Sequence, residues 1–79
     1  MTSPAKIPLV GQIAEVRREL ALRRSVYPGL ISRGKMREAE AELCTKRMEA
    51  VLATLHWCQE NETDIRAYVA AKRAGDGAP

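Results

Sequence analysis

Apolar residues recur in alternating steps of three and four over the second half of the chain, and this repeat constrains the fold more than any other feature. Its members are Ala41, Cys44, Met48, Val51, Leu55, Cys58, Ile65 and Val69, and the one polar residue in phase with them is Glu62. Such steps place side chains on one face of an α-helix. The pattern is typical of a helix that packs along a second helix. It predicts a long helix over residues 37 to 73.

An earlier apolar stripe predicts a first helix that begins at Pro8. The stripe consists of Leu9, Ile13, Val16, Leu20, Tyr27 and Leu30, with Arg23 in the remaining position. Proline suits a first helical turn, where its missing N–H would have no partner. Pro28 and Gly29 should kink or end this helix, and Gly34 should cap a short continuation in the left-handed conformation. The predicted fold is all-α, a helical hairpin with a kinked first helix.

The start of the second helix is marked by acidic residues. Glu38 and Glu40 fall in its first turn, where carboxylates meet the positive end of the helix dipole. Arg37 then occupies the N-cap position. The boundary between the two helices is therefore expected between Gly34 and Glu38.

The two predicted helices differ in length. A helix over residues 37 to 73 would be about 55 Å long, whereas the first helix could cover only about 30 Å of it. Either the chain breaks near Asn61, which would cap a third helix that folds back, or the long helix pairs with a second copy. The uninterrupted heptad phase favours a continuous or mildly kinked helix in a homodimer. The predicted dimer seam contains Met48, Val51, Leu55, Cys58, Ile65 and Val69.

The size of the chain also favours an oligomer. A chain of 79 residues has room for one domain, which we place at residues 8–73, between an extended arm at residues 1–7 and a disordered tail at residues 74–79. Domains this small usually need disulfides, a metal or a partner chain. Two cysteines make no disulfide framework, and one histidine makes no zinc pattern. We expect a homodimer without a cofactor.

No segment of the sequence indicates a membrane or secretory destination. The first residues lack a charged region followed by an apolar run, and no apolar run approaches the roughly 18 to 20 residues that span a bilayer. The expected location is the cytoplasm, with both cysteines as thiols.

Charge is divided along the chain. Residues 17–37 carry seven basic residues and one acidic residue, and residues 38–64 carry seven acidic and two basic residues. In a hairpin these blocks would flank the seam and help to set its pairing. Alternatively, the basic residues form a patch that binds nucleic acid or an acidic protein surface. That patch would consist of Arg17, Arg18, Arg24, Arg33, Lys35 and Arg37.

Two features argue against particular functions. A DNA-reading helix needs basic or polar residues at its start, whereas the helix after the turn begins with Glu38 and Glu40. Catalysis needs a nucleophile with a base in reach, whereas His56 and Cys58 are two residues apart and point to different faces of one helix. We therefore expect a binding protein and no enzyme.

Several segments together resemble a known group of proteins. They are Val16-Arg17-Arg18-Glu19-Leu20-Ala21-Leu22-Arg23-Arg24-Ser25-Val26-Tyr27-Pro28, Gly34-Lys35-Met36, Ala39-Glu40-Ala41 and Met48-Glu49-Ala50-Val51-Leu52. The chain resembles small uncharacterised proteins from the early regions of transposable, Mu-like phages and prophages. The resemblance implies an accessory protein in the host cytoplasm that binds and modulates or inhibits a host protein. A small basic nucleic-acid-binding regulator is the alternative.

Overall fold

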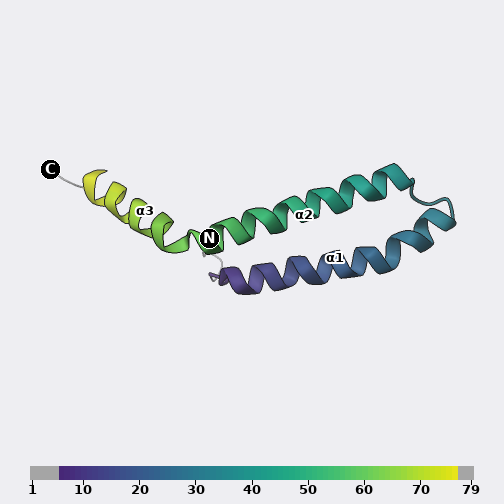
Figure 1. The fold of residues 1–79 in the computed structure, drawn as a ribbon, viewed down its shortest axis with the longest axis horizontal. Helices are drawn as coiled ribbons and strands as arrows, with labels where there is room; N and C mark the ends of the chain where they lie inside the picture. The colour runs from purple at the N-terminus through teal and green to yellow at the C-terminus, as the bar shows by residue number, and fades with distance from the viewer. Residues whose placement is uncertain (1–5, 77–79) are drawn as a thin grey trace, which may run out of the picture.

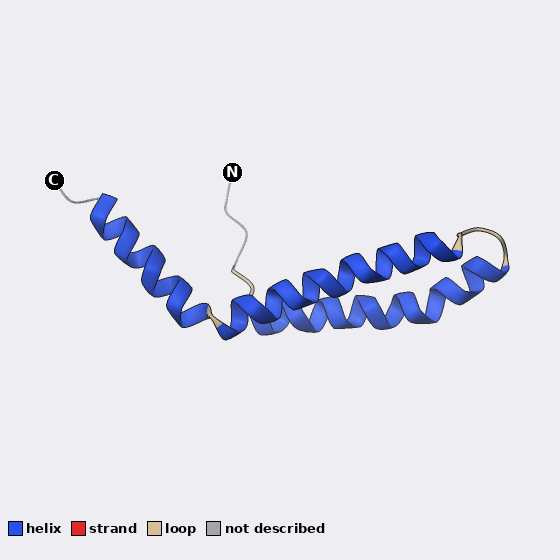
Figure 2. Ribbon diagram, turned by 45° about the horizontal axis from the view of Figure 1, so that its top comes forward, coloured by secondary structure: helices blue, strands red, loops and turns tan. Residues whose placement is uncertain are grey.

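Three α-helices make up the part of the chain that the computed structural model describes, residues 6 to 76 (Figures 1 and 2). They are α1 at Leu9–Ser32, α2 at Glu38–Glu60 and α3 at Glu62–Asp76, and no strand occurs within this range. The predicted all-α class is confirmed. Residues 1–5 of the predicted arm and residues 77–79 of the predicted tail lie outside the described residues.

The first two helices lie side by side and run in opposite directions (Figures 1 and 2). Residues 33–37 connect them at one end, and α3 leaves the other end of α2 and projects away from the pair. Within the described chain α3 contacts α2 and has no contact with α1. The result is an elongated molecule, 64 × 28 × 20 Å, with a radius of gyration of 18.5 Å. A compact chain of this length would have a radius of about 12 Å.

Burial is confined to the line where α1 meets α2. Among the described residues only Ile13, Leu20 and Ala41 are buried. Their neighbours on the same two stripes are half-buried, because a pair of helices encloses a side chain from two directions only. This narrow core explains why the chain exposes so much of its apolar surface.

The start of α1 lies one residue later than the sequence predicted. Pro8 is the N-cap, with φ −57° and ψ 149°, and is not the first helical residue. Its carbonyl accepts hydrogen bonds from the backbone N–H groups of Gly11 and Gln12, at 3.0 and 3.2 Å. The extended ψ of Pro8 turns that carbonyl toward the helix, which begins at Leu9.

The end of α1 follows the prediction for Gly34. The helix runs through Pro28 to Ser32, and Gly34 adopts φ +69°. The N–H of Gly34 donates to the carbonyl of Ile31, and the N–H of Lys35 donates to that of Leu30, at 3.0 and 2.8 Å. These two bonds define a Schellman motif. The predicted left-handed cap is confirmed.

Gly34→Ala is expected to lower the free energy of unfolding by about 1 to 2 kcal/mol, because a Cβ is disfavoured at positive φ. Gly29→Ala is the matched control in the last turns of α1. Its new Cβ would meet only the Arg33 guanidinium, at 3.8 Å, so this change should stabilise the helix by about 0.5 to 1 kcal/mol. Thermal unfolding of both variants measures the difference. Equal shifts in the same direction would contradict the assigned cap.

The predicted first turn of α2 is confirmed. Arg37 is the N-cap, in an extended conformation and without a side-chain capping bond, and Glu38 and Glu40 lie in the first turn. The helix dipole therefore provides the electrostatic support that a Ser or Thr cap would otherwise add.

The favoured continuous or mildly kinked helix over residues 37 to 73 is two helices in the structure, since α2 ends at Glu60 and α3 begins at Glu62; the chain breaks near Asn61, as the alternative had it. Asn61 has φ −108° and ψ 12°, and its side-chain amide donates to the carbonyl of Trp57 at 2.8 Å. Asparagine competes in this way for backbone groups and is a poor residue within a helix. Asn61 thus ends α2, and its carbonyl accepts the N–H of Ile65 at 2.9 Å, so it also precedes α3 as in the alternative that the sequence left open. That helix does not, however, fold back onto α1.

The last helix extends further than predicted. We expected a disordered tail from residue 74, whereas α3 continues through Ala74 and Gly75 to Asp76. Alanine has the highest helix propensity, and Ala70, Ala71 and Ala74 lie in these last turns. No helix of residues 6 to 76 is both long and apolar enough to cross a membrane.

Candidate functional site

The polar residue in the apolar stripe of α1, Arg23, joins the two paired helices. Its Nε donates to Glu19 Oε1 at 3.0 Å, and its NH1 donates across to the Cys44 carbonyl of α2 at 3.1 Å. The hydrogen bond to Glu19 raises the pKa of Arg23 above its ordinary value, which keeps the guanidinium charged. The sequence showed this residue only as an interruption of the stripe. The structure shows that it fixes which side of α1 faces Cys44.

Arg23→Met is expected to lower the melting temperature, because it removes the bond to Cys44 together with the pairing to Glu19. Arg24→Met is the matched control, since Arg24 is exposed and has no hydrogen bond within the described chain. Thermal unfolding monitored by circular dichroism compares the two. A melting temperature that falls as far for Arg24→Met as for Arg23→Met would contradict the assigned role of Arg23.

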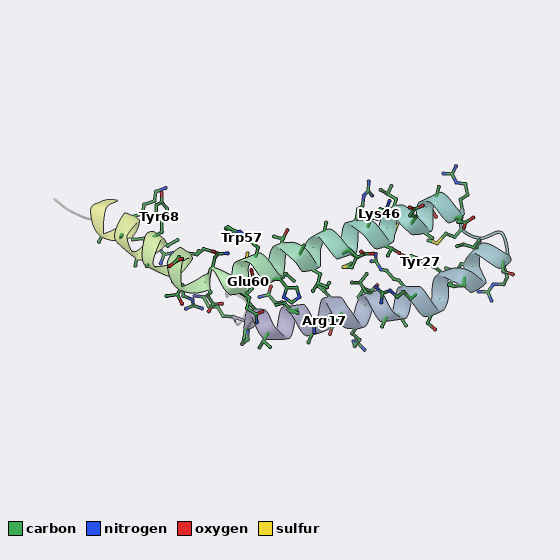
Figure 3. All side chains as sticks on the ribbon, viewed as in Figure 1. Arg17, Tyr27, Lys46, Trp57, Glu60 and Tyr68 are labelled. Atoms are coloured by element: carbon green, nitrogen blue, oxygen red, sulfur yellow. The ribbon has the colours of Figure 1, made fainter. Side chains whose placement is uncertain are left out.

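The basic residues predicted as one patch lie at separate places. Arg17 turns toward α2, where its NH2 lies 3.4 Å from His56 Nε2 (Figure 3). Arg18 pairs with Glu15 at 3.0 Å on an exposed face of α1, and this hydrogen bond raises the pKa of Arg18. Arg33, Lys35 and Arg37 lie about 24 Å further along, in and beside the loop. The six residues are therefore distributed between α1 and the loop that follows it.

A shallow groove of about 420 Å³ lies between α1 and α2 near the loop. Its charged lining alternates in sign, with Arg24 on α1 and Glu38, Glu42 and Lys46 on α2. Lys46 also pairs with Glu42 at 3.0 Å. Carboxylates beside these basic side chains weaken any attraction for a phosphate backbone.

A larger hollow of about 960 Å³ lies where the segment before α1 meets the junction of α2 and α3. Its apolar lining includes Ile7, Val10, Cys58 and Ile65. Ile7 and Val10 are 60% and 65% exposed, so the hollow is open to solvent. It offers an apolar surface at the bend of the molecule.

The residues predicted to form a dimer seam divide into two sets. Met48 and Leu55 are half-buried, and they follow buried Ala41 at intervals of seven residues, so they share the face of α2 that meets α1. Val51 is 46% exposed and Val69 is 37% exposed, and Cys58 and Ile65 are half-buried. The seam residues with exposed side chains are therefore Val51 and Val69.

Large exposed side chains lie on the outer faces of α2 and α3. Trp57 is 58% exposed and points away from α1, and Tyr68 on α3 is 69% exposed (Figure 3). Leu43, also on α2, is 49% exposed. Tyr27 lies half-buried between the paired helices, whereas Trp57 is free to contact another molecule.

No metal-binding group of three or more His, Cys, Asp or Glu side chains occurs within residues 6 to 76. Cys44 and Cys58 are free thiols and half-buried. Neither thiol has a histidine as a hydrogen-bond partner among the described contacts.

A comparison with protein-family models, with curated proteins and with solved structures finds no match to this chain.

Proposed function

We propose that this chain is a homodimeric accessory protein that binds a host protein through a helical surface and modulates or inhibits it. The observation that carries the proposal is the amount of apolar side chain that α2 and α3 expose, above all at Trp57 and Tyr68. Tryptophan and tyrosine are enriched among the residues that dominate binding energy at protein interfaces. The proposal involves no catalytic step and no cofactor, and it places the protein in the host cytoplasm.

The total accessible surface supports the need for partners. It amounts to 6677 Å² for a chain of 8.8 kDa, whereas a compact monomer of that mass would expose about 4,800 Å². The difference, about 1,900 Å², exceeds the roughly 800 Å² that one partner contributes to a standard interface. The chain thus has enough surface for a second copy and for a further protein.

Trp57→Ala is expected to weaken binding of the host protein by about 2 kcal/mol, or roughly thirtyfold, if Trp57 is a central contact. Tagged wild-type protein would be used to capture its partner from host lysate, and binding of the purified partner would then be measured for each variant. Leu22→Ala is the matched control, because Leu22 is 57% exposed on α1. Equal affinity of wild type and Trp57→Ala would contradict the assigned surface.

The homodimer is tested separately. Light scattering over a range of micromolar concentrations should give twice the chain mass of 8.8 kDa. Ile65→Asp together with Val69→Asp should shift the protein toward the monomer if α3 contributes to the seam. A wild-type protein that stays monomeric at high micromolar concentration would contradict the dimer.

The resemblance to early-region proteins of transposable phages supports the host-directed role. Early phage proteins of this size commonly bind a host protein and disable or redirect it. The helical hairpin and the predicted kink at Pro28 belong to the same proposal, in which α2 and α3 are the helices that contact the host protein.

The alternative function is that of a small nucleic-acid-binding regulator. It is favoured by the exposed basic residues of the loop, Arg33, Lys35 and Arg37. Binding through them should weaken steeply as salt rises, because phosphate contacts release counterions. A gel-shift series that shows no complex even at low salt would remove this alternative.

A further inference from the structure

We propose that two copies of this chain pair through one flank of α2 in opposite directions, so that Cys44 of each copy lies against the partner's Cys58. The inference rests on the homodimer proposed above. It adds the surface, the direction and the register of that dimer.

The flank is defined by a second stripe on α2. The first stripe, which includes Ala41, faces α1. Cys44, Val51 and Cys58 recur every seven residues beside it, and Val51 is 46% exposed while both cysteines are half-buried. The Arg23 guanidinium reaches the Cys44 carbonyl on this side, and nearly half of Val51 stays exposed. The stripe has heptad spacing without a partner helix, as in one half of a coiled coil.

Charge sets the direction of pairing. Residues 23–47 form the loop end of the paired helices and carry seven basic and three acidic residues, a net charge of plus four. The other end of the paired helices is formed by residues 6–22 and 48–66. It carries four basic and six acidic residues, a net charge of minus two. Parallel copies would place the two basic loop ends side by side, whereas antiparallel copies keep them apart. Repulsion between like charges therefore disfavours the parallel direction.

The symmetry of the stripe sets the register. Val51 lies seven residues after Cys44 and seven before Cys58. A two-fold axis at Val51 therefore places Cys44 opposite the partner's Cys58, and it aligns about 19 residues of each α2 over about 28 Å. Helices packed at 8 to 10 Å bring facing Cα atoms to roughly 3.4 to 5.4 Å, which overlaps the range that a disulfide spans.

The wild-type protein provides the first test. Mild oxidation with copper phenanthroline, which accepts the two electrons released per disulfide, should convert most of the protein into a covalent dimer on a non-reducing gel. Trypsin should then release the peptide of residues 38–46 joined to the peptide of residues 48–66. A bond within one chain cannot give this product, because Cys44 and Cys58 are about 21 Å apart along one helix.

Single-cysteine variants separate the two directions of pairing. Cys44→Ala and Cys58→Ala should each fail to cross-link alone, because antiparallel pairing keeps identical positions about 21 Å apart. When the two variants are mixed and allowed to exchange subunits, they should cross-link with each other. Parallel pairing predicts the reverse, with cross-links in each variant alone and none between them. Circular dichroism of each variant checks that it is folded.

Val51→Asp, at the proposed axis, should abolish cross-linking and shift light scattering to the monomer. Leu22→Asp, on the far side of α1, should change neither. A dimer whose peptides join like cysteines, or that does not cross-link at all, would overturn the antiparallel register while leaving the homodimer standing. A monomeric wild-type protein would overturn both.

Discussion

Replacing Leu20 with alanine is expected to lower the free energy of unfolding by about 2 to 5 kcal/mol, the range for a large-to-small change in a core. Leu20 is 5% exposed and is one of only three buried side chains in the described chain. The whole stability of a chain this size is roughly 4 to 12 kcal/mol. The variant should therefore lose a large share of its stability and unfold at a clearly lower urea concentration than the wild type.

Urea unfolding monitored by circular dichroism measures this effect, at a protein concentration where the wild type has a single oligomeric state. Leu22→Ala is the control, because it removes the same atoms from the same helix at a site that is 57% exposed. Its effect should stay within about 0.5 kcal/mol. If both substitutions lower the free energy of unfolding equally, Leu20 is not at the centre of the core.

The second large effect is a gain in stability. Pro28→Ala should raise the free energy of unfolding by up to about 3 kcal/mol, because α1 runs through Pro28 without the hydrogen bond from that position to the Arg24 carbonyl. Alanine restores this donor and removes the clash of the proline ring with the preceding turn. Each kcal/mol corresponds to roughly 4 to 8 °C in melting temperature for a domain of this size.

Ser25→Ala is the matched control for Pro28→Ala, since Ser25 is exposed on the same helix. It should add no more than about 0.5 kcal/mol through helix propensity. A loss of stability in Pro28→Ala would show that the geometry imposed by proline is needed to seat the last turns of α1 on α2. That outcome would support the predicted kink.

The local features of this fold could be predicted from the sequence because their causes are local. A glycine near the end of an apolar stripe predicts a left-handed cap, and Gly34 has one. Acidic residues predict a helix start, and Glu38 and Glu40 lie there. These signals depend on backbone conformation and on charges within one turn, which a short stretch of sequence specifies.

The break at Asn61 could not be predicted with the same certainty, because the heptad phase continues across it. The heptad pattern shows which face of a helix is apolar, but it does not show whether the helix is continuous. The competing signal was the asparagine itself, whose amide donates to the Trp57 carbonyl. Beyond this point no surface of α1 is available to hold a continued helix in place.

The surfaces for partners were harder still to assign. Met48 and Val51 belong to one periodic series, yet Met48 lies on the face toward α1 while Val51 is 46% exposed. Steps of three and four define an apolar arc on α2 that is wide enough to contact both α1 and a second chain. The spacing in the sequence does not show which residue contacts which of the two. The same limit applies to the basic residues, since Arg17 and Arg18 are adjacent in the sequence and make contacts on different sides of α1.

The interruption at Asn61 also separates two mechanical parts of the molecule. Because α3 contacts only the end of α2, its direction depends on the dihedral angles of a few residues at the joint. A partner that binds α3 can rotate it without disturbing Ile13, Leu20 or Ala41. A change of angle at this joint would move α3 as one unit and leave the contacts between α1 and α2 in place.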